Sequence, residues 1–455
     1  MSDEQKKLED LLKQLQLNNG NGPKINAEPV RGTNDFKFWK TQPVTSLEEE
    51  VTEEGPIDKP KKPEDISDKT LPMLAEFEWT TVDIEDNEQL EDVFVLLNEN
   101  YVEDRDSEFR FNYTKEFFKW ALKCPGWNKD WNVGVRVKNT GKLIAFISAI
   151  PVTLRVRSNI IKSVEINFLC VHKQLRAKRL APVLIKEITR RVNKTDIWQA
   201  LYTGGAILPS PIATCRYTHR PLNWNKLCDV GFTALPSNST NAEMVAKYTL
   251  PKVTATPGLR VMEEKDIEET LRLFNRYQER FELVQNFTKE EFHHWFLGGL
   301  DSTSSKDSNV IYSYVIEDKD GKITDFFSFY SLPFSILNHS VHKDLGIGYL
   351  FYYASDADFN YAERYNEEAT SKLKKRLDLI IRDACILANN SKMDVFNALT
   401  SQDNALFLDD LKFGSGDGFL NFYLFNYKAF PIHGGLLSNK SNDVEKRSNL
   451  GIVML

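Results

Sequence analysis

The strongest constraint on the fold of this chain is the segment 163–193, which has the pattern of a strand, a basic turn and a helix. Apolar residues run almost without interruption from Val164 to Val171, which predicts a strand covered on both faces. Pro182 stands where the first turn of a helix tolerates proline. Apolar residues then recur at helical spacing at Leu180, Val183, Leu184 and Ile188. The turn between strand and helix carries Lys173, Arg176, Lys178 and Arg179.

This basic turn is a candidate binding site for a polyphosphate. The first turn of a helix leaves backbone N–H groups free and carries the positive end of the helix dipole. The alternative is a solvated basic turn on an amphipathic helix, and the charge pattern alone does not separate the two. The whole chain has 58 Lys and Arg against 65 Asp and Glu, a net charge of −7. The cations are therefore a local feature, and the composition argues against nucleic acid as a partner.

Length and composition predict a globular protein of two or three domains. The chain has 455 residues, of which 41% are hydrophobic and 12% aromatic, enough for substantial cores. Its five cysteines form no CxxC pair and no metal-ligand spacing, so we expect a reducing compartment and no metal. The amino terminus lacks an apolar signal core, and no apolar run has the length that a bilayer requires. These features predict a soluble, cytoplasmic protein.

The order of predicted elements suggests one folding unit that occurs twice. Residues 1–34 are polar and predict a disordered arm. A strand (76–84), a helix (87–102) and a hairpin (131–157) precede the opening segment, and a strand (196–203) follows it. The second run of the hairpin is expected to stop at Pro151.

The second copy repeats the hairpin at 315–336 and places a strand at 346–358. Its last strand, 394–399 (DVFNAL), matches 196–201 (DIWQAL). Ordered similarity over roughly 200 residues indicates two copies of one fold rather than a solenoid. The basic turn belongs to the first copy alone, so phosphate binding is expected in the amino-terminal half.

This layout resembles the GNAT acyltransferase superfamily, whose turn between strand and helix holds the CoA pyrophosphate. The turn Gln174–Arg179 lacks the glycines of that superfamily. Two longer motifs, Glu165–Lys173 (EINFLCVHK) and Lys412–Gly418 (KFGSGDG), are similar to the signatures of the eukaryotic glycylpeptide N-tetradecanoyltransferases, or N-myristoyltransferases. The resemblance extends from Phe36 to Leu455 and is greatest to the yeast enzymes.

The resemblance implies an α/β fold with a mixed sheet, in which two tandem GNAT-like units are fused around a pseudo-two-fold axis. Residues 1–34 would be a flexible arm. Residues 35–220 would bind acyl-CoA and form the oxyanion hole. Residues 221–455 would bind the peptide and supply the catalytic carboxyl terminus.

The implied reaction is transfer of a tetradecanoyl group from its CoA thioester to the α-amine of an N-terminal glycine. Backbone N–H groups of Phe168 and Leu169 would polarise the thioester carbonyl, provided that the strand bulges there. Asn167 and Thr203 match positions that hold the amine, although ordinary strand-end hydrogen bonding also explains them. The chain ends on the apolar run SNLGIVML. The residues alone favour a simple closing strand here, whereas the resemblance implies that the buried Leu455 carboxylate is the base.

Myristoyl-CoA is expected as a co-substrate, with no permanently bound cofactor. Its predicted contacts are Phe36, Lys37, Phe38, Trp39, Leu169, Cys170, Val171, Arg176, Ala177, Lys178, Arg179, Leu180 and Ala181. The predicted peptide contacts are Tyr101, Glu103, Asp104, Asp106, Phe109, Phe111, Tyr113, Tyr217, His219, Asp417 and Gly418. A solvated acidic loop and a structural histidine are the alternatives for this second set. Further expectations are N-terminal-glycine peptides, nascent proteins and the ribosome as partners, and a monomeric state.

Two other functions and one other mechanism are compatible with parts of the sequence. A GNAT N-acetyltransferase would use acetyl-CoA, and a non-catalytic protein would only bind acyl-CoA. Cys170 beside His172 could form a covalent acyl-enzyme, but a bulge next to this pair makes a Cys–His contact hard to hold. Acyl-chain preference cannot be derived from the pattern.

Overall fold

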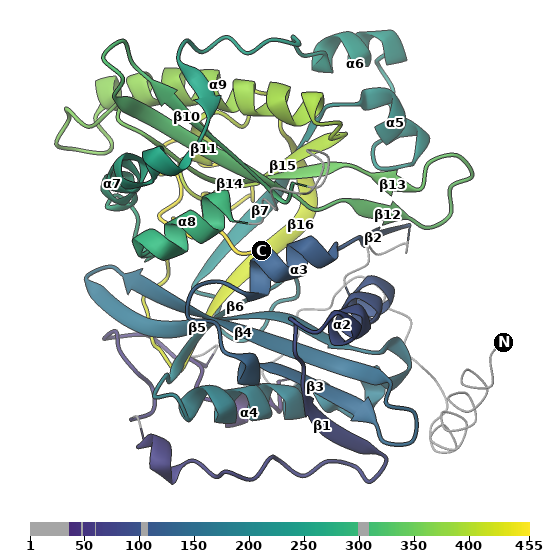
Figure 1. Ribbon diagram of the computed structural model, residues 1–455. Helices are drawn as coiled ribbons and strands as arrows, with labels where there is room; N and C mark the ends of the chain where they lie inside the picture. Colours follow the sequence, from purple (N-terminus) through teal and green to yellow (C-terminus); the bar gives the residue numbers. More distant parts are fainter. Residues whose placement is uncertain (1–35, 47–48, 60, 102–107, 299–308) are drawn as a thin grey trace.

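The computed structural model describes residues 36–46, 49–59, 61–101, 108–298 and 309–455, and its central feature is a 13-stranded mixed sheet (Figure 1). In its described residues, the first half of the chain contributes five consecutive strands of this sheet and three helices. The strands are β1 (Phe77–Thr81), β3 (Asn132–Val137), β4 (Leu143–Val156), β5 (Asn159–Val171) and β6 (Gln199–Gly204). The helices are α2 (Asn87–Asn100), α3 (Lys115–Leu122) and α4 (Leu180–Asn193).

The second half repeats this arrangement. Its strands are β8 (Leu259–Val261), β10 (Ile311–Glu317), β11 (Ile323–Ser331), β14 (Ile347–Ser355) and β15 (Val395–Leu399), and its helices are α7 (Ile267–Gln278), α8 (Lys289–Leu297) and α9 (Glu367–Asn390). The small helices α5 (Trp224–Asp229) and α6 (Asn241–Tyr248) connect the halves. A separate sheet joins β2 (Phe109–Phe111), β12 (Phe334–Ile336) and β13 (Asp344–Leu345). β9 (Leu283–Gln285) pairs with β4, so the two halves also meet there.

The strand order of the large sheet carries the internal symmetry. The order is β1-β3-β4-β5-β6-β16-β7-β15-β14-β11-β10-β8. Read from either edge toward the centre, it passes through equivalent strands of the two halves. The pairs β5–β6 and β14–β15 are parallel, and each is connected through a long helix, α4 or α9. β7 (Ala213–Pro221) pairs with β15, and β16 (Gly414–Phe425) pairs with β6, so each half lends its last strand to the other. The structure therefore confirms two copies of one fold.

Two predictions about local structure are wrong. β4 continues through Pro151 to Val156, whereas the sequence predicts that it stops at the proline. Pro151 pairs with Val164 of β5 and lies between the residues of β4 that pair with β3 and those that pair with β9. A missing N–H is tolerated there because that edge of β4 has a gap in its pairing. The carboxyl-terminal run is mostly buried, but it forms two isolated bridges, Ser448 with Gly434 and Leu450 with Leu283, and not a strand.

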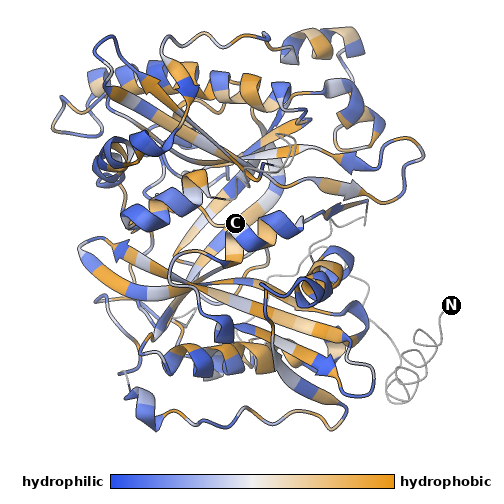
Figure 2. Cartoon of the chain, viewed as in Figure 1, coloured by the Kyte–Doolittle hydropathy of each residue, from blue (hydrophilic) through white to orange (hydrophobic). Residues whose placement is uncertain are grey.

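Many hydrophobic residues of the central strands, which Figure 2 colours orange, have buried side chains that form the core. One core spans both halves, and a second lies under α4, whose buried apolar residues are Leu180, Leu184, Ile188 and Val192. The outer faces of the helices are more hydrophilic, as their apolar periodicity requires. The predicted helical spacing after the basic turn is thus confirmed.

Candidate active site

The candidate active site begins where β5 and β6 separate. Their parallel ladder pairs Ser163–Glu165 with Gln199–Leu201 and does not continue further along the described residues of β5. On its other edge β5 stays paired with β4, but the register shifts: Cys170 pairs with Phe146 and Asn167 pairs with Ser148. Phe168 and Leu169 therefore face one residue, Ile147, which is the geometry of a β-bulge. The predicted bulge is confirmed.

The bulge places Phe168 in an uncommon backbone conformation. Its φ angle is +57°, in the left-handed region that bulky residues rarely adopt. The Phe168 side chain is buried among Tyr113, Phe118 and Tyr101, with ring centroids 5.7, 5.4 and 6.2 Å away. This aromatic packing offsets the cost of the strained backbone at the point where the β5–β6 ladder ends.

A cavity fills that gap and brings several predicted catalytic residues together. Its volume is about 180 Å³. Asn167, Phe168, Leu169, Thr203 and Leu455 all line it. The remaining lining residues are Trp39, Tyr101, Ile147, Val164, Ile166, Ile185, Ile188, Thr189, Val192, Asn193, Trp198, Gln199, Ala200, Tyr202, Leu208 and Phe425. The wall on the α4 side is mostly apolar, so it suits an acyl chain.

Leu455 reaches the cavity from the far end of the chain. The preceding residues, Leu450 to Met454, are buried, and the terminus lies between the two halves of the molecule (Figure 1). The Gly451 N–H donates to the Leu283 carbonyl at 2.8 Å, and the Gln402 N–H donates to the Leu450 carbonyl at 2.8 Å. The terminal residue is therefore held within the protein, as the apolar ending predicts.

Glu165 lies beside the site, but the sequence analysis named it only as part of the motif 165–173 and gave it no role. Its buried carboxylate accepts a hydrogen bond of 2.7 Å from the Asn167 side-chain amide. Burial raises the pKa of Glu165 to about 7, and the Asn167 bond opposes that rise. The Ser148 hydroxyl donates to the Asn167 carbonyl at 3.0 Å. The only available signal was a carboxylate within an apolar strand.

The basic turn lies at the exposed end of the β5–α4 connection. A 3-10 helix, η5 (Lys173–Lys178), leads to Arg179, whose φ of +58° turns the chain into α4. No side chain caps the amino terminus of α4, and its first turn has no acidic residue. Arg176 donates to the Asn100 carbonyl, and Ala177 and Arg179 are exposed. Free N–H groups beside these cations suit an anion.

The predicted acyl-CoA contacts differ in which of their atoms a ligand can reach. The Leu180, Cys170 and Val171 side chains are buried, so only their backbone atoms could reach a ligand. Ala181 is half-buried, and Lys178 is half-buried in the turn. Burial raises the pKa of the Cys170 thiol to about 12, which opposes the thiolate that a covalent mechanism needs. This environment disfavours the acyl-enzyme alternative.

The segment from Phe36 to Trp39 docks against the same region. Phe36 is buried, Lys37 is exposed and Phe38 is half-buried, and Trp39 begins the 3-10 helix η2 (Trp39–Thr41). The Trp39 ring stacks on Tyr202 with centroids 5.4 Å apart and nearly parallel planes. Tyr202 stacks in turn on Tyr423 at 5.0 Å. Trp39 thereby closes one side of the cavity, and Tyr202 is a second lining residue that the sequence reasoning missed.

The predicted peptide contacts fall into two groups. Tyr101, Phe111 and Tyr113 form an aromatic cluster, with the Tyr101 and Tyr113 centroids 6.1 Å apart and those of Phe111 and Tyr113 5.6 Å apart. Phe109 extends the cluster across the small sheet to Phe334. Glu103, Asp104 and Asp106 lie outside the described residues.

The second group lies where β7 meets β16. Between the pairs Ser415–Thr218 and Phe419–Arg216, three residues of β16 oppose Tyr217 alone, and this wide bulge exposes Asp417 and Gly418. The His219 Nδ1 atom lies 2.7 Å from the Asn397 side-chain oxygen, and burial lowers the pKa of His219. Gly416 packs on the His219 ring so closely that an added Cβ would lie 2.4 Å from Nε2. A glycine is therefore required at this position.

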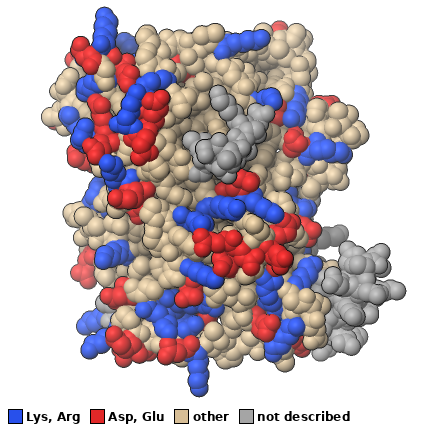
Figure 3. Space-filling model, in the orientation of Figure 1, with Lys and Arg blue, Asp and Glu red and all other residues tan. Residues whose placement is uncertain are grey.

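Three features of the described residues bear on the class of protein: the surface charge, possible metal sites and the hydropathy of the helices. On the face shown in Figure 3, basic and acidic side chains of the described residues are interspersed. Among these residues, no group of three or more His, Cys, Asp or Glu side chains could hold a metal ion. None of the helices that the structure describes is both long enough and apolar enough to cross a membrane. All five cysteines are described and free.

A mixed sheet built from two such units, with a splayed strand pair in one of them, is the architecture of a GNAT-like acyltransferase. Comparison with known families is more specific. Residues 56–215 match the amino-terminal domain and residues 229–453 the carboxyl-terminal domain of "Myristoyl-CoA:protein N-myristoyltransferase". The chain belongs to this family, which confirms the identification made from its two motifs.

Individual relatives agree over the full length. The glycylpeptide N-tetradecanoyltransferase of Saccharomyces cerevisiae is 66% identical over 453 residues, covering 100% of this chain and 99% of the relative. That of Candida glabrata is 65% identical over 451 residues, covering 99% and 100%. A crystal structure of the Saccharomyces cerevisiae N-myristoyltransferase with bound myristoyl-CoA matches with a TM-score of 0.91 and 67% identity, covering 93% of this chain and 100% of that one. The predicted fold class is confirmed.

Proposed function

We propose that this protein transfers the tetradecanoyl group of myristoyl-CoA to the α-amine of an N-terminal glycine. The observation that carries this proposal is the single cavity lined by Leu455, by the bulge at Phe168 and Leu169, and by Asn167 and Thr203. It combines a carboxylate, two backbone amides and two polar side chains next to an apolar wall. The names of the full-length relatives support the same activity.

The amino-terminal half would hold the acyl-CoA. The unpaired edge of β5 beyond Glu165 offers backbone groups to the pantetheine, in the way that an added strand would pair. The uncapped end of α4, with Arg176 and Arg179 nearby, would bind the phosphates. The apolar residues of α4 and β6 that line the cavity would surround the acyl chain, beneath the Trp39 ring.

The acyl transfer would proceed by direct attack of the amine on the thioester. The amine must first lose a proton, because an α-amino group has a pKa of roughly 7.7–8.0 and its ammonium form is not nucleophilic. The Leu455 carboxylate would take this proton while Asn167 and Thr203 hold the amine. Backbone N–H groups of Phe168 and Leu169 would stabilise the oxyanion. The C–S bond then breaks, and the CoA thiolate takes the second proton of the attached amine, which gives the amide and the CoA thiol.

The division of labour between the halves is part of the proposal. Residues 35–220 would bind acyl-CoA, and residues 221–455 would supply the terminal base and, with the aromatic cluster of the first half, the peptide groove. Asp417 would attract a basic residue of the peptide. We further propose a cytoplasmic monomer that acts on nascent proteins and meets the ribosome.

The test is removal of Leu455, compared with a variant that carries one added glycine after it. Both changes displace the terminal carboxylate, so we expect turnover of a glycine-initiated peptide to fall by about 100-fold or more, as for loss of a general base. Thermal stability and myristoyl-CoA binding should be retained, since the acyl-CoA contacts lie in the other half. Unchanged turnover would exclude the terminal base.

Substrate choice is a separate measurement. Purified protein is offered acetyl-CoA and myristoyl-CoA with the same peptide. We expect tetradecanoyl transfer. A preference for acetyl transfer would support an N-acetyltransferase, and binding without any transfer would support an acyl-CoA-binding protein.

A further inference from the structure

The last residues of the chain are held by one side chain in particular. The Tyr352 hydroxyl accepts a hydrogen bond from the Val453 N–H at 3.0 Å and donates to the Val453 carbonyl at 3.4 Å. A single hydroxyl therefore binds both backbone groups of a residue that lies two positions before the terminal carboxylate. Val453 and Met454 are buried, and Leu455 lines the cavity.

Tyr352 is itself rigidly mounted. It is 1% exposed and belongs to a bulge in β14, where Phe351 and Tyr352 oppose Ser328 of β11. The Ser328 hydroxyl accepts from the Tyr352 N–H at 3.2 Å and donates to its carbonyl at 2.9 Å. The tyrosine ring packs against Phe274, Phe287 and Phe296, with centroids 5.5, 5.7 and 6.0 Å away. Burial raises the pKa of Tyr352, so the hydroxyl keeps the proton that it donates.

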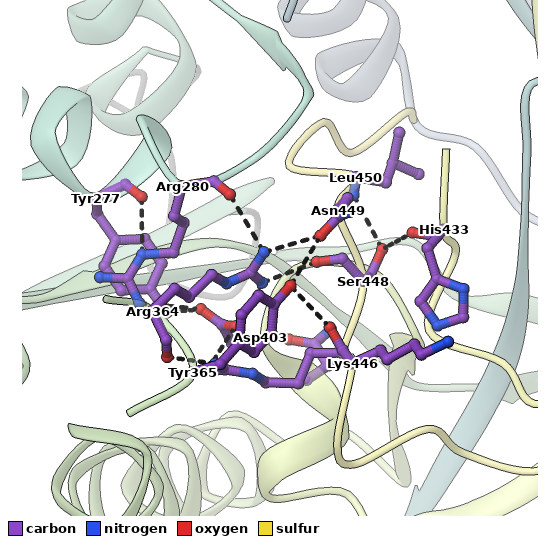
Figure 4. A network of polar contacts seen from close by, with 12 residues as sticks. Tyr277, Arg280, Arg364, Tyr365, Asp403, His433, Lys446, Ser448, Asn449 and Leu450 are labelled. Carbon is purple, nitrogen blue, oxygen red and sulfur yellow. Dashed lines mark hydrogen bonds and ion pairs between the residues drawn. The ribbon is translucent and has the colours of Figure 1, made fainter. Parts of the chain in front are cut away.

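A second anchor lies upstream in the same segment (Figure 4). Arg364 donates to the Asp403 carboxylate at 2.7 Å, to the Ser448 carbonyl at 2.8 Å and to the Asn449 side-chain oxygen at 3.0 Å. Asp403 is fully buried and also pairs with Arg280 and Arg447. This network holds residues 448–450 but ends five residues before the carboxylate.

We propose that Tyr352 is a positioning residue for acyl transfer: its hydroxyl sets the place of the Leu455 carboxylate in the cavity by binding Val453. The inference rests on the proposed function, because it gives the terminal carboxylate its catalytic role. The Arg364–Asp403 network brings the segment to the cavity, and the tyrosine determines where its last two residues point. Placement matters because an error of about 1 Å at a reacting group can cost on the order of 100-fold in rate.

The test is a double-mutant cycle of Tyr352→Phe with removal of Leu455. Tyr352→Phe keeps the packed ring and removes only the hydroxyl. The matched control is Tyr314→Phe, which removes a hydroxyl from a half-buried tyrosine of β10. For each variant, the single-turnover rate with a glycine-initiated peptide, the dissociation constant of myristoyl-CoA and the melting temperature are measured.

We expect Tyr352→Phe to lower the single-turnover rate by about 10-fold or more, as a displaced base would, with acyl-CoA affinity retained. In the protein without Leu455 the same change should cost nothing further, because there is no positioned carboxylate left to displace. Tyr314→Phe should leave the rate unchanged. A merely structural tyrosine would instead lower the rate equally in both backgrounds, through a loss of folded protein visible in the melting temperature.

The possible failures are distinguishable. If removal of Leu455 leaves turnover unchanged, the proposed function loses its base, whatever Tyr352 does. If removal of Leu455 lowers turnover but Tyr352→Phe does not, the terminal base stands and the positioning role is excluded. Equal losses from Tyr352→Phe in both backgrounds also exclude it.

Discussion

Each copy of the folding unit contains a β-bulge in its central strand, and the two bulges have different surroundings. In β5 the bulge at Phe168 and Leu169 faces Ile147, and in β14 the bulge at Phe351 and Tyr352 faces Ser328. In the second bulge, side chains of the protein bind the backbone groups. Ser328 binds the Tyr352 backbone, and the Gln402 side chain donates to the Phe351 carbonyl at 3.0 Å. The first bulge faces an apolar side chain and borders the cavity. A duplicated fold can thus keep one site open for a ligand and fill the other with its own groups.

The helices that follow show the same contrast. The amino terminus of α4 has no side-chain cap and no acidic residue in its first turn. That of α9 is capped by Asn366, whose side chain accepts from the Ala369 N–H, and carries Glu367 and Glu368. Acidic side chains neutralise the helix dipole at α9, while at α4 the positive end remains for an external anion. Three predictions test this difference, in addition to the experiments on Leu455 and Tyr352.

The largest expected effect concerns the buried carboxyl group that β5 has and β14 lacks. Glu165 lies three residues before the bulge of β5 and pairs with Ile150, whereas Gly348 lies three residues before the bulge of β14 and pairs with Ser331. The folded pKa of Glu165 is about 7, above its ordinary value of 4.5, so the folded state holds the proton over this range while the unfolded state releases it. Stability should therefore fall as the pH rises from 4.5 to 7, by about 3 kcal/mol from this residue.

Denaturant unfolding of the natural protein and of Glu165→Gln between pH 4 and pH 8 measures this contribution. The glutamine variant has no proton to lose at this position, so the difference between the two curves should grow across that range. A constant difference at all pH values would show that Glu165 titrates normally.

The next effect concerns the open helix end. Arg176→Ala combined with Arg179→Ala should raise the dissociation constant of CoA by about 100-fold at low salt, because two charge-assisted contacts are lost. The loss should shrink at high salt, where screening already weakens those contacts in the natural protein. Isothermal titration at two ionic strengths checks this, with Lys186→Ala as the control on an exposed part of α4. A loss independent of salt would point to misfolding.

The smallest effect is expected from a substitution that makes the surroundings of the first bulge resemble those of the second. Ile147→Ser places a hydroxyl opposite the bulge of β5, as Ser328 stands opposite the bulge of β14, so it should compete for the amides of Phe168 and Leu169. Ile147→Ala is the matched control, since it opens a similar space without a hydroxyl. We expect a turnover of Ile147→Ser about 10-fold below that of Ile147→Ala, because a satisfied amide is a poorer oxyanion donor. Equal turnover of the two variants would show that these amides do not contribute to catalysis.

Sequence patterns were most informative where the physics is local. The strand at β5, the apolar face of α4 and the repeat between 196–201 and 394–399 all follow from periodicity over a few residues. Pro151 shows the limit of such reasoning, because its tolerance depends on a gap in the pairing of neighbouring strands. Glu165 and Tyr202 were missed for the same reason: their roles arise from partners that are close only in the folded chain.

The sequence by itself determined the family, the two-copy organisation, the basic turn and the burial of the carboxyl terminus, since each is written in contiguous residues. Tertiary structure decided how these parts meet. It exchanged β7 and β16 between the halves, left the β5 bulge open while filling that of β14, and brought Leu455 into a cavity with Asn167 and Thr203. Strand register and long-range packing determine such contacts, because they depend on which surfaces exclude water together.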